Sequence, residues 1–182
     1  MAELDADDNY DCELKKNGSR TVFWNTKDSA PKKFGDFVFW NRHKEPMSYV
    51  PSNELLDELR SLELPNNTHI DLELLHMKTK CTKNYLYLYD LYLLGGKLMT
   101  GTLEERRNRL QELLKGKQYQ HLSIAERRPR GFKDWYEEAT KNPINEGIVI
   151  KDKRGKIVWN AKVSPDVTWQ IKCRVQHANY KF

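Results

Sequence analysis

Alternating apolar and polar positions predict several β-strands along the chain. The longest alternation lies between residues 84 and 96, where tyrosine and leucine alternate as they do in a sheet strand with two unlike faces. An apolar strand is predicted at residues 37–40, and a strand with an acidic pair at 69–75. Further strands are predicted at residues 11–14, 20–24, 145–152 and 156–159, and a last strand is expected to begin near Val167.

Three helices are predicted from apolar residues at helical spacing and from their capping residues. Ser52 is an N-cap for a helix whose leucines recur until the proline and asparagines at residues 65–67 end it. Thr102 and Glu105 have the spacing of a capping box, which predicts a second helix. A shorter helix is predicted at residues 132–140, with Trp135 on its apolar side.

The length and composition favour one soluble domain. A chain of 182 residues with 38% hydrophobic content is large enough for a two-layer core. No apolar run is long enough for a membrane span, and the acidic start of the chain is unlike a signal peptide. The protein is therefore expected to be intracellular.

The composition also restricts the ligands. The three cysteines are far apart and odd in number, which favours neither a disulfide framework nor a zinc site, and the five histidines lack metal-ligand spacing. Any metal is therefore expected to be bound by carboxylates and phosphates. The net charge of +5 is compatible with a polyanionic partner, because cationic side chains that neutralise phosphates release counterions.

The segment from Glu13 to Arg20 places a lysine before a glycine turn and an arginine after it. Lys15 in this position can act as a nucleophile, provided that its surroundings lower its pKa enough to free the amine. Gly18 allows the backbone to approach a phosphate, and Arg20 offers a planar guanidinium to phosphate oxygens. The alternative interpretation is an ordinary exposed hairpin turn.

The same segment resembles the Lys-x-Asp-Gly-x-Arg signature of the covalent nucleotidyltransferases, which comprise ATP-dependent DNA ligases, RNA ligases and mRNA capping enzymes. Asn17 stands where the signature has aspartate. The resemblance implies that Lys15 is the catalytic nucleophile toward ATP and that Glu13 and Arg20 bind the nucleotide.

Other segments resemble the remaining motifs of this family, in the family's order. Glu73 matches the glutamate that holds the nucleotide ribose, although Leu72 replaces the family's glycine, and Tyr89 matches the aromatic residue that stacks on the purine. Arg42 and Arg106 match family arginines, and the resemblance implies that both bind nucleic acid. From the residues alone, Tyr89 is a packing residue of a sheet and the two arginines are solvated surface charges.

The most specific resemblance lies at residues 145–152, because Glu-Gly, three apolar residues and Lys-Asp are characteristic of ATP-dependent ligases. Packing alone does not explain a buried strand that starts with a carboxylate and ends with a lysine. The resemblance implies that Glu146 holds Mg2+ and that Lys151 faces phosphate. It also implies that Lys172 and Arg174, in the last predicted strand, bind the nucleotide.

The resemblance implies an α+β fold of the ligase nucleotidyltransferase type. Antiparallel sheets with flanking helices are expected around a nucleotide cleft, in a single adenylation domain at residues 1–182 without an OB-fold domain. The implied function is the sealing of nicked DNA through lysyl-AMP, with ATP and Mg2+ as cofactors.

Two alternatives to DNA ligation stay open. RNA ligation or mRNA capping is the enzymatic alternative, and an inactive nucleic-acid-binding relic is the non-enzymatic one. The expected partner is a nicked DNA or RNA duplex, the protein is expected to act as a monomer, and a separate protein could supply a surface that closes over the site.

Overall fold

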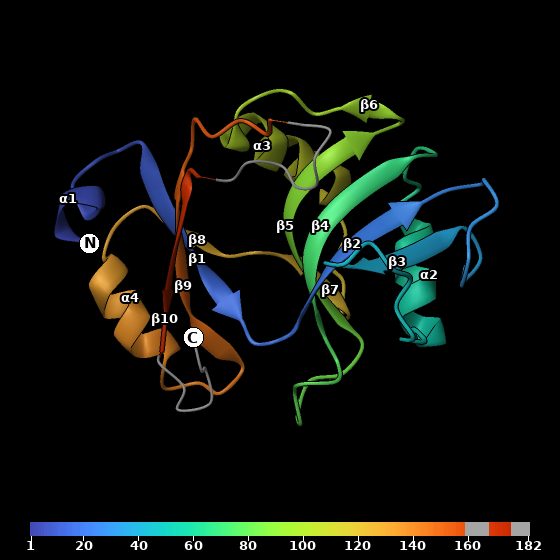
Figure 1. Cartoon of the computed structure of the whole chain (residues 1–182), viewed down its shortest axis with the longest axis horizontal. Helices are drawn as coiled ribbons and strands as arrows, with labels where there is room; N and C mark the ends of the chain where they lie inside the picture. Colours follow the sequence, from blue (N-terminus) through green and yellow to red (C-terminus); the bar gives the residue numbers. More distant parts are fainter. Residues whose placement is uncertain (159–167, 176–182) are drawn as a thin grey trace. The chain divides into compact units, whose positions relative to one another are not determined.

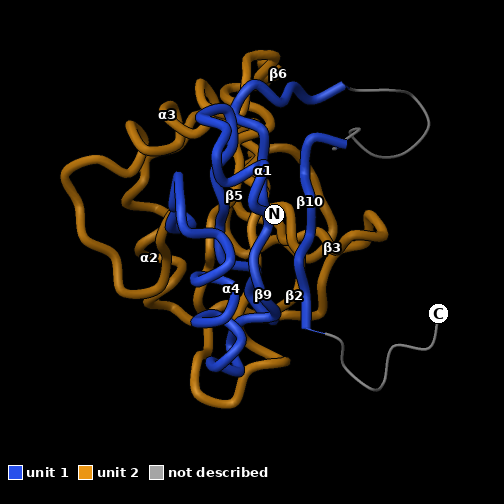
Figure 2. Tube along the Cα trace, turned by 90° about the vertical axis from the view of Figure 1, so that its left-hand side faces the viewer, with its two compact units in different colours: residues 1–17, 125–182 blue, residues 18–124 orange. Residues whose placement is uncertain are grey.

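The computed structural model describes residues 1–158 and 168–175, and Figure 1 labels its helices and strands. The chain divides into two compact units. Unit 1 consists of residues 1–17 and 125–182, and unit 2 consists of residues 18–124 (Figure 2). Unit 2 is therefore an insertion in the sequence of unit 1. That the two units act as one domain stays a prediction.

Unit 1 is built on a four-stranded antiparallel sheet with the strand order β10-β9-β1-β8. Unit 1 also contains two helices, α1 and α4. The elements are α1 (Ala2–Asp5), β1 (Tyr10–Lys16), β8 (Arg127–Arg128), α4 (Phe132–Ala139), β9 (Asn145–Asp152) and β10 (Gln170–Arg174).

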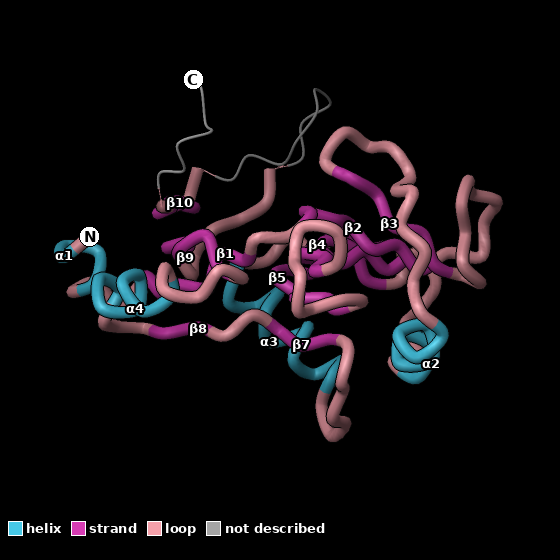
Figure 3. The backbone as a smooth tube through the Cα atoms, turned by 90° about the horizontal axis from the view of Figure 1, so that it is seen from below, coloured by secondary structure: helices cyan, strands magenta, loops and turns pink. Residues whose placement is uncertain are grey.

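The apolar core of unit 1 lies between its sheet and α4, which runs along one side of the strands in Figure 3. Cys12 of β1 and Ile148 and Ile150 of β9 are buried with Phe132 and Trp135 of α4. Because side chains alternate along a strand, the residues between these core positions point to the opposite face of the sheet. Burial raises the pKa of the Cys12 thiol to about 12, so this cysteine is a core residue rather than a nucleophile.

Unit 2 contains a six-stranded sheet. Five strands follow the order β3-β2-β4-β5-β6, and β7 pairs in parallel with β5. Its elements are β2 (Ser19–Asn25), β3 (Phe37–Asn41), α2 (Asn53–Ser61), β4 (Thr68–Leu75), β5 (Tyr85–Leu94), β6 (Lys97–Leu98), α3 (Leu103–Leu114) and β7 (Leu122–Ile124).

Both helices of unit 2 cover the same face of its sheet, as Figure 3 shows. Leu55 of α2 and Leu110 of α3 are fully buried in one core with Phe23, Ile70 and Leu72 from the strands. The caps form as predicted. The Ser52 hydroxyl accepts a hydrogen bond from the Leu55 N–H, and both hydrogen bonds of the capping box at Thr102 are present.

The hairpin interpretation of the turn around Gly18 is wrong, because the strands on either side of the turn belong to different sheets. β1 pairs with β9 and β8, whereas β2 pairs with β3 and β4. Each strand is thus central in its own sheet, where both edges are hydrogen-bonded. The turn links two sheets, and turn chemistry alone could not reveal this.

Most predicted strands and all three predicted helices are present, with ends that differ by a few residues. The helix α2 ends at Ser61, before the predicted proline. The short elements α1, β6, β7 and β8 were not predicted, because two to four residues are too few for a periodic pattern. The strand predicted at residues 156–159 is wrong in its described part, because residues 156–158 form only isolated bridge positions and no strand. Trp159, at the end of that predicted strand, and Val167, at the start of another, lie outside the described residues.

No helix in the described part of the chain is long and apolar enough to cross a membrane.

Gly147, in the middle of unit 1, offers a test of how closely β9 and β10 pack. It has φ +138°, and a Cβ there would lie against the carbonyl oxygen of Cys173 in β10. We expect Gly147→Ala to lower the free energy of unfolding by about 1–3 kcal/mol, measured by denaturant titration.

Gly131 is the matched control, because it also has a positive φ, +73°, but a Cβ there meets nothing within 4 Å. Gly131→Ala should therefore lower the free energy of unfolding through backbone strain alone, and by less than Gly147→Ala does. Equal losses for both variants would contradict the role of close strand packing at Gly147.

Candidate active site

The face of the unit 1 sheet opposite α4 carries a row of charged side chains. Along β1 these are Asp11, Glu13 and Lys15, which alternate with the core residues. In β9, Lys151 lies opposite Asp11 and Gly147 lies opposite Lys15. In β10, Lys172 lies opposite Val149 and Arg174 lies opposite Gly147. Opposite residues of an antiparallel pair share a face, so the sheet brings together the predicted site residues Glu13, Lys15, Lys151, Lys172 and Arg174.

Glu146 joins this charged face through an irregularity in the pairing of β1 with β9. Lys15 lies opposite Gly147 but Lys16 lies opposite Asn145, so Glu146 is an extra residue in β9. Strict alternation would place Glu146 on the same face as Ile148, and a bulge of this kind redirects the side chain. As a result, the Lys15 ammonium donates a hydrogen bond to Glu146 Oε2 in an ion pair.

The Lys15–Glu146 ion pair is largely shielded from water. The side chains of Lys15 and Glu146 are 18% and 13% exposed. An amine attacks phosphorus through a free electron pair, so the Lys15 ammonium must lose a proton before it can react. The neighbouring Lys16 instead donates to Asn145 Oδ1 at 2.9 Å.

Two further ion pairs lie on the same face, one of them fully buried and the other partly buried. Lys151 Nζ lies 2.5 Å from Glu13 Oε2, with both side chains at most 4% exposed. Arg127 of β8 donates to Asp11 Oδ2. Burial raises the pKa of the Asp11 carboxyl, and the adjacent Arg127 guanidinium opposes that shift. These pairs fix the positions of Glu13 and Lys151 beside the predicted nucleophile.

In unit 2, the face opposite the helices carries the predicted residues Arg20, Glu73 and Tyr89. Arg20 lies opposite Glu73 in the sheet, its guanidinium donates two hydrogen bonds to Asp71, and its central carbon lies 5.0 Å from the centre of the Tyr89 ring. The guanidinium therefore lies over the Tyr89 ring in a cation–π contact, and the ring is buried, with 4% of the residue exposed. Stacking of Tyr89 on a purine stays a prediction.

Gly18 has a structural role in unit 2 beside the one predicted from its sequence. Its N–H donates to Glu73 Oε1 at 3.1 Å. A Cβ at this position would lie 2.6 Å from the carbonyl oxygen of Leu74 and 2.7 Å from Glu73 Cγ. The glycine therefore lets the chain pass directly over β4, next to the predicted ribose ligand.

The two arginines predicted to bind nucleic acid have different surroundings. Arg42 is exposed in the turn after β3, where its Nε lies 3.1 Å from His43 Nε2. Arg106 is fully buried in α3, where its guanidinium donates to both carboxylate oxygens of Asp90 at 2.8 and 2.9 Å and to the Gly101 carbonyl at 2.7 Å. This buried pair fastens α3 to β5. The contact of Arg106 with nucleic acid stays a prediction.

Sequence reasoning missed the buried partners of the predicted charges. Asp11, Asp71 and Asp90 each hold an arginine, and the buried Arg107 donates to the carbonyl oxygens of Leu88 and Tyr89. An available signal was a carboxylate inside a largely apolar strand, because such a group is rarely buried unless it is paired.

The acidic residues of the described chain offer Mg2+ few protein ligands. No group of three or more His, Cys, Asp or Glu side chains that could hold a metal occurs among residues 1–158 and 168–175. Mg2+ commonly uses one or two carboxylates together with substrate phosphates and water, and Glu146 on the charged face fits that ligand set. Mg2+ binding at Glu146 stays a prediction.

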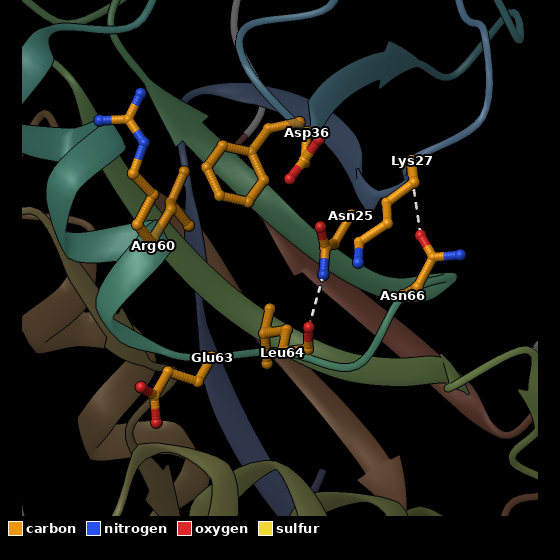
Figure 4. A pocket seen from close by; sticks show the side chains of 9 residues that line it. Asn25, Lys27, Asp36, Arg60, Glu63, Leu64 and Asn66 are labelled. Carbon is orange, nitrogen blue, oxygen red and sulfur yellow. Dashed lines mark hydrogen bonds between the residues drawn. The ribbon is translucent and has the colours of Figure 1, made fainter.

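A hollow of about 240 Å3 in unit 2 contains none of the predicted site residues. Figure 4 shows Asn25 donating to the Leu64 carbonyl and the Lys27 N–H donating to Asn66 at its wall. Its charged lining is balanced, with two cations and two carboxylates: Lys27, Arg60, Asp36 and Glu63. This balance offers no net attraction to an anion.

Comparison with known proteins supports the fold. Family models and curated protein sequences gave no match to this chain. Among solved structures, the ligase domain of LigD from M. tuberculosis is 17% identical over 86% of this chain, with a TM-score of 0.58. A mycobacterial DNA ligase D complexed with ATP and MES is 17% identical over 85%, with a TM-score of 0.60, and a Lig E DNA ligase is 13% identical over 91%, with a TM-score of 0.56.

The predicted fold is therefore confirmed: the chain has the α+β fold of the ligase nucleotidyltransferase domain. It spans 51% of each of the two ligase D chains and 64% of the Lig E chain.

The Glu13–Lys151 pair can be tested by removing one partner and then both. Lys151→Met leaves the Glu13 carboxylate buried without this cation, so we expect a loss of about 3–5 kcal/mol in the free energy of unfolding. The double variant Glu13→Gln, Lys151→Met should regain most of that loss in the same denaturant titration. A double variant as unstable as the single one would show that the charges are not coupled.

Proposed function

We propose that this chain is an ATP-dependent polynucleotide ligase that seals nicks in duplex DNA through a covalent lysyl-AMP intermediate. The observation that carries the proposal is the Lys15–Glu146 ion pair on a face that also holds Lys151, Lys172 and Arg174. It supports the proposal because the residue expected to be the nucleophile contacts the residue expected to hold the metal, on a face with three cations that would suit a triphosphate. The fold shared with DNA ligase domains supports the proposal.

The first chemical step uses the free amine of Lys15. The Lys15 ammonium first loses a proton, which the Glu146 carboxylate can accept. The Lys15 Nζ then attacks the α-phosphorus of ATP, a nitrogen–phosphorus bond forms, and the bond from that phosphorus to the bridging β-phosphate oxygen breaks. Pyrophosphate leaves with the bonding electron pair, and AMP stays on Lys15.

The next two steps transfer AMP and close the nick. The 5′-phosphate oxygen of the nick attacks the phosphorus of lysyl-AMP and releases Lys15. The 3′-hydroxyl then attacks the activated 5′-phosphate, loses its proton, and expels AMP. Both steps are nucleophilic substitutions at phosphorus, as the first is.

The remaining residues of the charged face would stabilise the phosphoryl oxygens. Lys151, Lys172 and Arg174 supply positive charge where negative charge spreads during transfer. Glu13 holds the Lys151 ammonium at 2.5 Å, so it would act mainly by positioning that cation. Bound Mg2+ would neutralise further phosphate charge, and Glu146 is the residue that would hold it.

The unit 2 residues would bind the nucleoside part of ATP. Tyr89 offers its ring to the purine, the Glu73 carboxylate can accept hydrogen bonds from ribose hydroxyls, and Arg20 lies between Asp71 and the Tyr89 ring. Stacking selects weakly among bases, so the choice of ATP over GTP depends on other contacts.

mRNA capping and an inactive relic are outcomes that the labelling experiment below separates from ligation. RNA ligation is the alternative that labelling by ATP does not distinguish from DNA ligation. A closing surface supplied by a second protein is also part of the proposal.

Incubation with radiolabelled ATP followed by denaturing electrophoresis tests the nucleophile. We expect the chain to retain label and Lys15→Ala to retain none. Lys16→Ala is the matched control, because Lys16 is the next residue of β1 but pairs with Asn145. It should keep the label. Label on the Lys15→Ala variant would sink the assignment, label from GTP alone would favour capping, and no label from either would favour the relic.

The two glutamates should differ in their dependence on metal. Glu146 lies beside Lys15 in unit 1, whereas Glu73 accepts from Gly18 in unit 2. Raising Mg2+ or Mn2+ should partly restore adenylylation to Glu146→Ala, because added metal compensates for a weakened ligand set. It should not restore Glu73→Ala, which lacks a ribose contact. Equal rescue of both variants, measured as initial labelling rates, would contradict these separate roles.

A further inference from the structure

One end of the unit 2 sheet carries a cluster of cationic side chains. The turn at residues 42–45 follows β3, and the loop at residues 76–84 joins β4 to β5. Together they contain five cationic side chains and one carboxylate: Arg42, Lys44, Lys78, Lys80, Lys83 and Glu45. The whole chain has a formal net charge of only +5. These two segments are called the basic end below.

The sheet register places the two segments at the same end. Asn41 of β3 and Leu72 of β4 both lie opposite Thr21 of β2. β3 and β4 therefore flank β2 and leave the sheet on the same side, about 10 Å apart at the usual strand spacing. β2 also begins at this end, and Gly18 and the predicted ribose ligand Glu73 lie there as well.

Tyr49 ties the two segments together. The chain returns from the turn along β3, with the Met47 N–H donating to the Phe39 carbonyl. The Tyr49 ring then lies 4.9 Å from the His76 ring, and its hydroxyl donates to Asn84 Oδ1 at 2.9 Å. His76 and Asn84 are the two ends of the β4–β5 loop, so the turn and the loop form one structure.

The β4–β5 loop forms internal hydrogen bonds and leaves two of its lysines exposed. The Thr79 hydroxyl is buried and donates to the Thr82 carbonyl, Lys83 donates to the His76 carbonyl, and the Asn84 N–H donates to His76 Nδ1. Lys78 and Lys80 are exposed on either side of Thr79. The internal hydrogen bonds of the loop therefore hold the backbone on either side of Thr79, from which the Lys78 and Lys80 side chains extend.

The exposed apolar residues of the basic end indicate what kind of partner fits. Met77 is 75% exposed and Val50 is 66% exposed, and each is next in sequence to one member of the Tyr49–His76 contact. A partner for this surface must offer negative charge and apolar area together. A polynucleotide does so through its phosphates and its sugars.

We propose that the basic end of unit 2 binds the phosphate backbone of a nucleic-acid duplex, with Lys78 and Lys80 as phosphate contacts. This inference rests on the proposed function in taking a polynucleotide as the substrate. No motif of the sequence assigned the β4–β5 loop to this task. The opposite end of the same sheet carries the charge-balanced hollow, which makes the attraction specific to one end.

The test compares Lys78→Ala, Lys80→Ala with the control variant Lys27→Ala, Lys97→Ala. All four lysines are exposed residues of unit 2, and Lys27 and Lys97 lie at the opposite end of the sheet, so both variants lose the same charge. Binding to a fluorescent nicked DNA duplex, and to an RNA duplex in parallel, is measured by anisotropy from about 50 to 200 mM salt.

We expect the Lys78, Lys80 variant to bind roughly tenfold more weakly and the slope of log K against log salt to decrease by about 2, because each lost phosphate contact removes about 0.9. The control should bind as the unaltered chain does. Equal binding by both variants would overturn the inference, and so would equal competition by polyglutamate, since that polymer offers charge without phosphates.

Self-adenylylation of the same variants separates this inference from the proposed function. A chain that takes no label from ATP but loses duplex binding with Lys78 and Lys80 refutes the ligase proposal and supports the basic end. A chain that takes label normally, and whose Lys78, Lys80 variant binds the duplex as well as the unaltered chain does, supports the ligase proposal and refutes the role of the basic end.

Discussion

The pairing of β1 with β9 is the constraint on which the rest of the site depends. It sorts the side chains of both strands into an apolar face that packs on α4 and a charged face that holds Glu13, Lys15 and Lys151. A shift of one residue would move the charges into the core and the core residues outward. The buried Glu13–Lys151 pair penalises such a shift, because either charge alone would be buried without its partner. The strand register that forms the core of unit 1 therefore also decides which charged side chains surround Lys15.

Ion pairs play the same part in unit 2. Asp71 holds Arg20 next to Tyr89, and Asp90 holds Arg106 against β5. Buried pairs contribute little net stability, but they exclude alternative packings of the charged side chains. Both units thus use carboxylates that are absent from the recognised motifs to orient residues that are present in them. The motif residues are positioned before any ligand binds.

The sequence predicted residues that share a face more reliably than it predicted which strands pair. Period-two alternation is a local property, so Glu13 and Lys15 could be assigned to one face without knowledge of their partners. The pairing of β1 with β9 depends on distant residues, which is why a local hairpin was a reasonable but wrong alternative. Glu146 reaches Lys15 only through a bulge, for which the adjacent Gly147 was the one visible signal. The burial of Arg106 was hidden because its partner, Asp90, lies in another element.

The insertion of unit 2 within the sequence of unit 1 has a consequence for biosynthesis. β1 is synthesised before unit 2, yet the lysine that pairs with Glu13 follows 138 positions later. Unit 2 has all of its own strands by residue 124 and can fold first, as continuous segments do during synthesis. Until β9 emerges, the edge of β1 that pairs with β9 is open to other chains. The short, acidic and lysine-containing sequence around β1 is of the kind that resists such association in the meantime.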